Sequence, residues 1–261
     1  MPADSGASAL AGKRVLITRA PQQAGDFAAA VSARGGVAVV APAISIAPPD
    51  DPHRAHRAID ELARYAWVVF SSQNAVDAFF DRIEALDADA RYLAGRKVAA
   101  IGSTTARRLR ERGIRADLVP ALYVGEELAR ALIEALRPGD RVLVFRAQEA
   151  RDVLPRMLSD AGVACDVVAA YKTVVPYDPA FAANLAAADV VTFASASSVA
   201  GLLEQIGAGA PDAMRDKVVA CIGPVTAGAA REAGLHVDVV AETSTAQGLL
   251  DALEAHLSQT A

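Results

Sequence analysis

Two different segments of this 261-residue chain each occur twice, and the two kinds alternate along the sequence. The first kind, the A repeat, reads RVLITRA from Arg14 and RVLVFRA from Arg141. The second kind, the B repeat, begins at Trp67 and returns at Val190. The order A, B, A, B indicates a duplicated architecture rather than one continuous domain.

The B repeats also match in their later parts. Residues 101–119 and residues 222–240 are identical at nine of nineteen positions. Each A repeat is an apolar run, a helical stretch and a second apolar run, which is the βαβ pattern. One A repeat has too few strands for a stable sheet, whereas one A and one B repeat together supply five parallel strands with helices on both faces.

The pairing of repeats follows from their order. Residues 67–168 hold a B repeat followed directly by an A repeat, so the middle of the chain forms one domain and the two ends form the other. The sequence predicts an α/β fold of two flavodoxin-like domains, each an open parallel five-stranded sheet. We place them at residues 1–45 with 177–261 and at residues 46–176. The chain then crosses twice between domains, and we expect a two-stranded connector there.

Composition limits the possible ligands. The net charge is −5, which argues against a broad surface for nucleic acid. No apolar stretch approaches the roughly 20 residues that a bilayer crossing needs, and the start of the chain lacks signal-peptide features, so we expect no membrane contact and a cytoplasmic location. Cys165 and Cys221 are expected to be buried thiols, and the arginines of residues 107–115 to cover a solvated helix face.

Motifs for cofactors and metals are missing. There is no P-loop lysine pattern, and Gly207-Ala-Gly209 is followed by Asp212 where a dinucleotide fingerprint needs glycine. His53 and His56 lie three apart without a third ligand nearby in sequence. The sequence therefore predicts neither a cofactor nor a metal.

Hydroxyl and amide side chains follow four of the predicted strands, where the chain enters a helix. In open parallel sheets, ligands bind at this edge. Such residues cap helices, which alone explains any one of them, but free N–H groups at a helix start also bind anions. The residues are Ser72, Asn74, Ser103, Thr105, Ser195, Ser197 and Thr226.

Several motifs together resemble one family, the uroporphyrinogen-III synthases, over roughly residues 10–257. The motifs are VLITR from Val15, VVFSSQNAV from Val68, VAAIGSTTA from Val98, RA at Arg146 with RDVLP from Arg151, YKT from Tyr171 and CIGPVTA from Cys221. Each is weak alone, but their order and spacing are specific. The resemblance implies a HemD-like fold and a cofactor-free lyase that closes linear hydroxymethylbilane to uroporphyrinogen III, with loss of water and inversion of ring D.

The resemblance also implies roles for individual residues. Tyr171 stands at the position that the family associates with activity, where a phenol can donate a proton, although it could instead pack a hinge. Family correspondence favours Ser72, Thr105 and Thr226 for the substrate, with Ser195 as the repeat counterpart of Ser72. Three arginines are candidate carboxylate partners or structural ion-pair residues: Arg19, Arg146 and Arg151.

The expected ligand carries eight carboxylates and is a small molecule. We expect it to bind in the cleft between the domains of a monomer that could contact hydroxymethylbilane synthase transiently. A non-catalytic two-domain ligand-binding protein is the alternative, because paired α/β domains also suit ligand sensing. A flavin-binding redox protein is a second alternative.

Overall fold

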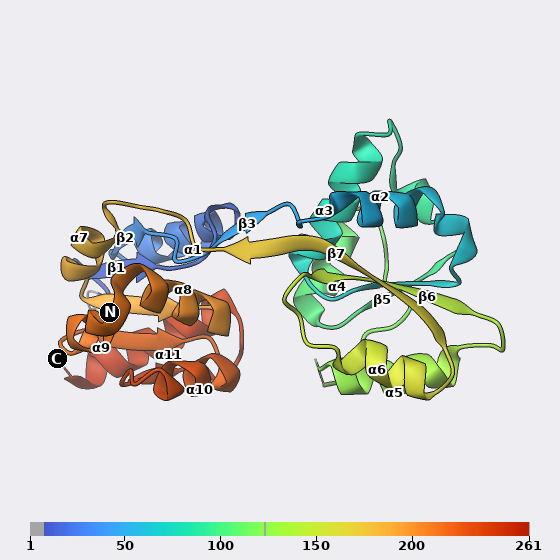
Figure 1. Cartoon of the computed structure of the whole chain (residues 1–261). Helices are drawn as coiled ribbons and strands as arrows, with labels where there is room; N and C mark the ends of the chain where they lie inside the picture. The colour runs from blue at the N-terminus through green and yellow to red at the C-terminus, as the bar shows by residue number, and fades with distance from the viewer. Residues whose placement is uncertain (1–7, 123, 261) are drawn as a thin grey trace, which may run out of the picture. The chain divides into compact units, whose positions relative to one another are not determined.

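The computed structural model describes residues 8–122 and 124–260 and divides the chain into two compact units. The end unit comprises the described residues up to Ser45 and those from Val174 onward, and the middle unit comprises Ile46–Thr173. Each unit is a five-stranded sheet with helices on both faces (Figure 1).

The sheet of the end unit has the order β10-β9-β8-β1-β2, and all its neighbouring pairs are parallel. In chain order within the unit this is 2-1-3-4-5, the order of doubly wound sheets of the flavodoxin type. Its strands are β1 (Arg14–Ile17), β2 (Val37–Val40), β8 (Val190–Phe193), β9 (Val218–Cys221) and β10 (Val239–Val240). Its helices are α1 (Pro21–Ala33), α7 (Phe181–Ala186), α8 (Ala196–Ile206), α9 (Ala210–Met214), α10 (Pro224–Glu232) and α11 (Ala246–Thr260).

The sheet of the middle unit has the order β3-β7-β6-β4-β5, with parallel pairing from β7 to β5. Its strands are β3 (Ser45–Ala47), β4 (Trp67–Phe70), β5 (Lys97–Ala100), β6 (Arg141–Ala147) and β7 (Ala164–Val174). Its helices are α2 (Pro52–Asp60), α3 (Gln73–Glu84), α4 (Ser103–Glu111), α5 (Gly125–Ala135) and α6 (Val153–Asp160).

One part of the strand prediction is wrong for this sheet. The repeat predicts that the fifth strand lies in the later part of the B repeat, after β5. In that part, Leu118 forms only an isolated bridge with Ala99. The fifth strand of the sheet is instead β3, which lies at the edge opposite β5. The equivalent segment of the end unit does form β10. The edge beside β7 is available because β7 pairs with β6 on its other side, so that β7 would be the edge strand without β3.

The two faces of the middle sheet have separate cores. Phe70 and Phe145 point to the face covered by α2, α3 and α4, where they stack at 5.6 Å between ring centroids. Val69 and Val144 point to the face covered by α5 and α6, and Figure 1 shows these helices on opposite sides of the sheet from α2 and α3. Strands buried on both faces read as continuous apolar runs, as β4 does.

Helix α3 shows why such a segment folds as it does. Val76, Phe79, Phe80 and Ile83 recur at helical spacing and are all buried against the sheet. Ser72 supplies the N-cap. The described part of the chain has no helix with the length and apolar character of a bilayer crossing.

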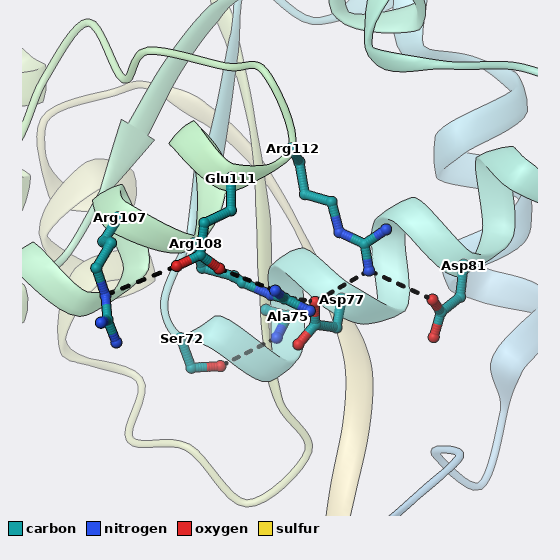
Figure 2. Close-up of polar contacts among 8 residues, drawn as sticks. All are labelled: Ser72, Ala75, Asp77, Asp81, Arg107, Arg108, Glu111 and Arg112. Atoms are coloured by element: carbon teal, nitrogen blue, oxygen red, sulfur yellow. Dashed lines mark hydrogen bonds and ion pairs between the residues drawn. The ribbon is translucent and has the colours of Figure 1, made fainter. Parts of the chain in front are cut away.

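The arginines between residues 107 and 115 do not all cover a solvated face as expected. Arg108 of α4 and Arg112, which directly follows that helix, both bind the carboxylate of Asp77 on α3, at 2.6 and 3.3 Å (Figure 2). Both side chains are about two-thirds covered, so they join the two helices, whereas Arg107 and Arg110 are exposed as predicted.

Both cysteines are free thiols. Cys221 is buried and Cys165 is partly buried, and burial raises the pKa of each thiol to about 11. The expectation of buried thiols is therefore confirmed for Cys221 and is true only in part for Cys165.

Candidate functional site

A cavity of ≈ 280 Å³ lies in the middle unit at the carboxyl ends of β4 and β6. These neighbouring strands continue to opposite faces of the sheet, β4 into α3 and β6 into α6. Such a switch point is where doubly wound sheets bind ligands, because the two departing chains leave a crevice between them. The polar side chains that line it are Ser71, Ser72, Glu126, Arg146, Arg151 and Tyr171.

Tyr171 reaches this cavity because β7 contains a bulge. Arg146 pairs with Ala169, but Ala147 pairs with Tyr171, so Ala170 is an extra residue. Consecutive side chains of a regular strand point to opposite faces, yet Ala170 and Tyr171 both join the core on the Phe70 face. The bulge therefore turns the phenol toward the helix α3 side, where only 9% of the residue is exposed.

Ser72 connects the start of α3 to that phenol. Its Oγ accepts a hydrogen bond from the amide of Ala75 at 3.1 Å, which caps the helix, and donates one to the Tyr171 hydroxyl at 3.0 Å. Figure 2 shows the capping bond. In this arrangement, with Ser72 as the donor, the proton of Tyr171 is available for a ligand. A donor to the phenolic oxygen also stabilises the negative charge that develops when the phenol gives up its proton.

The two arginines of the cavity differ in their contacts. Arg146 donates to the carbonyl of Arg151 at 3.0 Å and binds the carboxylate of Asp152 at 2.6 Å, so its guanidinium holds the loop that leads into α6. Within residues 8–122 and 124–260, the guanidinium of Arg151 has no hydrogen-bond or ion-pair partner. Of the two arginines that line the cavity, Arg151 is therefore the one available to bind an anion.

The other predicted residues of the middle unit do not line this cavity. Asn74 lies in the first turn of α3. Ser103 is exposed and Thr105 is buried in the first turn of α4, a helix that begins after Gly102 without a side-chain cap. The four residues brought together are therefore Ser72, Arg146, Arg151 and Tyr171.

The remaining predicted residues belong to the end unit and lie at equivalent places in its sheet. Ser195 caps α8 through the amide of Ser198 at 3.1 Å, while Ser197 is exposed in the same turn. Thr226 is buried in the first turn of α10, which follows Gly223 without a side-chain cap.

Arg19 follows β1 and has an unusual environment. Burial lowers the pKa of its guanidinium below the ordinary value, and its buried Nε has no hydrogen-bond partner in the part of the chain that the structure describes. A buried guanidinium nitrogen without a partner is costly, which makes Arg19 a second candidate for binding an anion.

Sequence reasoning did not select Glu126. It lies in the first turn of α5 and lines the cavity. In the sequence, a glycine followed by an acidic residue marks the start of a helix beyond the B repeat. Only the folded structure brings that helix beside β4 and β6.

Metal binding has no support in the described residues, where no three His, Cys, Asp or Glu side chains gather in a ligand set. The site instead combines a phenol, a hydroxyl, two arginines and one carboxylate. This arrangement can donate a proton and bind an anion of a small molecule.

Replacing Ser72 with alanine is expected to have two separable effects. Loss of the cap should lower the free energy of unfolding by about 0.5–2 kcal/mol, and loss of the donor to Tyr171 should lower turnover. Thr245→Ala is the matched control for stability, because Thr245 Oγ1 accepts from the amide of Gly248 at 3.0 Å at the start of α11. Urea unfolding should give similar losses for both variants, and equal turnover in the two would contradict the role of the hydroxyl pair.

Comparisons with known proteins agree on one family. The model of the uroporphyrinogen-III synthase HemD family matches residues 25–251. A "putative uroporphyrinogen-III synthase" of Methanothermobacter thermautotrophicus is 31% identical over 94% of this chain and 99% of its own length. The "porphyrin biosynthesis protein HemD" of Ruminiclostridium josui is 30% identical over 94% of this chain, but the match spans only 48% of that longer protein.

Solved structures share the fold. A mutant uroporphyrinogen III synthase from Thermus thermophilus aligns with a TM-score of 0.65 over 95% of this chain and all of its own, at 21% identity. The synthetase from Helicobacter pylori aligns with a TM-score of 0.60 at 16% identity, over 94% and 99% of the two chains.

Proposed function

This chain belongs to the uroporphyrinogen-III synthase family, and we propose that it closes hydroxymethylbilane to uroporphyrinogen III with loss of water and inversion of ring D. The observation that carries the proposal is the hydroxyl pair in the cavity of the middle unit. Ser72 donates to Tyr171 at 3.0 Å, which leaves the phenolic proton for the substrate.

The first chemical step is the departure of the ring A hydroxyl group. The C–O bond breaks with its electron pair going to oxygen, the proton of Tyr171 converts that oxygen to water, and the ring A nitrogen supplies the electrons that form the azafulvenium cation. The phenolate that remains accepts the hydrogen bond of Ser72. General acid catalysis of this kind is effective because the proton is already in position when charge develops.

The cation is then attacked by the substituted carbon of ring D. The resulting spiro intermediate fragments and recloses in the inverted orientation with loss of one proton, which balances the proton given to the leaving oxygen. Because hydroxymethylbilane also closes unaided to the uninverted isomer, positioning of the rings contributes more than acid strength.

Binding is assigned to the carboxylate groups of the substrate. We propose that Arg151 binds one of them, since its guanidinium has no partner within the described residues, and that Arg146 holds the loop that carries Arg151. The helix starts contribute further contacts through amides and hydroxyls. The other residues proposed to bind substrate are Asn74, Ser103, Thr105, Ser195, Ser197, Thr226 and Arg19.

Isomer analysis tests the activity directly. Purified protein is incubated with freshly made hydroxymethylbilane, the products are oxidised to porphyrins, and the type I and type III isomers are separated. Type III isomer is expected in excess over a reaction without protein. Formation of the uninverted type I isomer alone would exclude this function.

The domain organisation, the cellular location and the oligomeric state of the enzyme are part of the same proposal. Residues 1–45 with 177–261 and residues 46–176 act as two flavodoxin-like domains, and the segments at β3 and the end of β7 act as their two-stranded connector. In support, β3 and β7 are neighbours in the middle sheet, and the chain passes between units within them. We propose a cytoplasmic monomer that contacts hydroxymethylbilane synthase transiently, which size-exclusion chromatography of the two proteins together can check.

A further inference from the structure

Glu126 is an acidic residue in a cavity whose other charged side chains suit an anion. It stands at the second position of α5 and lines the cavity with Ser72, Tyr171 and Arg151. It is partly buried, so its carboxylate is not simply a solvated surface group.

Ion pairing does not account for this carboxylate. No Lys, Arg or His within residues 8–122 and 124–260 lies at ion-pairing distance from Glu126. The neighbouring Glu127 pairs with Arg130 and also places negative charge in the first turn of α5, where it favours the helix. Glu126 shares this favourable position in the first turn, but it lacks such an ion pair and faces the cavity, to which it adds a negative charge.

That charge opposes the binding of a substrate with eight carboxylates. It becomes favourable only where the bound molecule is a hydrogen-bond donor or a cation, namely at the pyrrole N–H groups and at the azafulvenium formed when water leaves. A charge placed where the opposite charge develops lowers the barrier more than it helps ground-state binding.

We infer that Glu126 is a further catalytic residue, whose carboxylate accepts a hydrogen bond from the ring A pyrrole N–H and stabilises the azafulvenium cation. This inference rests on the proposed function. Glu126 forms and breaks no covalent bond. The C–O bond breaks, Tyr171 protonates the departing oxygen, and the nitrogen that supplies electrons keeps its proton and its positive charge beside the Glu126 carboxylate. Tyr171 and Glu126 thus act on the two charges that bond cleavage separates.

The test compares Glu126→Gln with Glu127→Gln, which removes the same charge from the adjacent position of the same helix. Turnover of freshly made hydroxymethylbilane and inhibition by uroporphyrinogen III are measured for both variants and for the unaltered protein. For Glu126→Gln we expect kcat to fall on the order of 100-fold, with product binding unchanged or tighter because a like charge is lost. Glu127→Gln should keep kcat within about twofold.

The possible outcomes distinguish a failure of the inference about Glu126 from a failure of the proposed function. An inactive unaltered protein would overturn the proposed function itself, whereas an active protein whose Glu126→Gln variant keeps normal kcat would overturn only the role of Glu126. Equal losses in both glutamine variants would also overturn it, since they would indicate an effect on the helix. If circular dichroism shows that Glu126→Gln does not fold, Glu126→Asp keeps the charge at a shorter reach and is expected to lower kcat by a smaller factor; normal kcat there would count against the inference.

Discussion

Replacing Tyr171 with phenylalanine is expected to lower kcat on the order of 100-fold, at the lower end of the range for loss of a general acid. The reduction is limited because ring closure also occurs without the enzyme. Only the hydroxyl is removed, so the ring keeps its place in the core on the Phe70 face. Loss of the bond from Ser72 should cost about 1 kcal/mol of unfolding free energy, and the remaining turnover should yield a larger share of uninverted isomer.

Tyr65→Phe is the matched control for this prediction. Tyr65 belongs to the same core, and its hydroxyl binds the carboxylate of Asp166 at 2.8 Å. Burial and this bond raise the pKa of Tyr65 to about 12, and the residue does not line the cavity. Its variant should lose stability but keep its turnover. Normal turnover in Tyr171→Phe would exclude a chemical role for Tyr171, and equal reductions in both variants would attribute the effect to the core.

Replacing Phe79 with alanine is expected to give the largest loss of stability, about 3–5 kcal/mol. Phe79 is fully buried on α3, and its ring lies 5.4 Å from the rings of both Phe70 and Phe145. Phe70 and Phe145 come from the two strands beside the candidate site. The void left by the substitution would therefore loosen α3, the helix that Ser72 caps. A loss of this size is a large part of the 5–15 kcal/mol typical of a folded domain.

Urea unfolding of the purified variant measures this effect. Tyr177→Ala removes an aromatic ring of similar size from a residue that is 92% exposed, and it should leave the transition midpoint unchanged. A loss below about 1 kcal/mol for Phe79→Ala would show that the aromatic core does not support α3.

Part of the candidate site could be predicted from residue order alone. A hydroxyl residue after an apolar strand and before a helix lies at the carboxyl edge of a parallel sheet, and Ser72 does so. Such reasoning does not distinguish Ser72 from Ser103, because both follow strands and begin helices. Only Ser72 lines the cavity, since β4 lies beside β6 at the point where the connections diverge, while β5 is at the sheet edge.

The sequence by itself determined the repeated α/β plan, the resemblance to one family and the candidate hydroxyl residues, because periodicity and order along the chain depend on local patterns. Tertiary structure decided which edge of the middle sheet β3 joins, how the bulge at Ala170 turns Tyr171 toward Ser72, and that Glu126 shares their cavity. These features depend on contacts between residues far apart in sequence: Tyr171 and Ser72 are 99 positions apart. No local pattern specifies such a contact, which forms only when the strands take their order in the sheet.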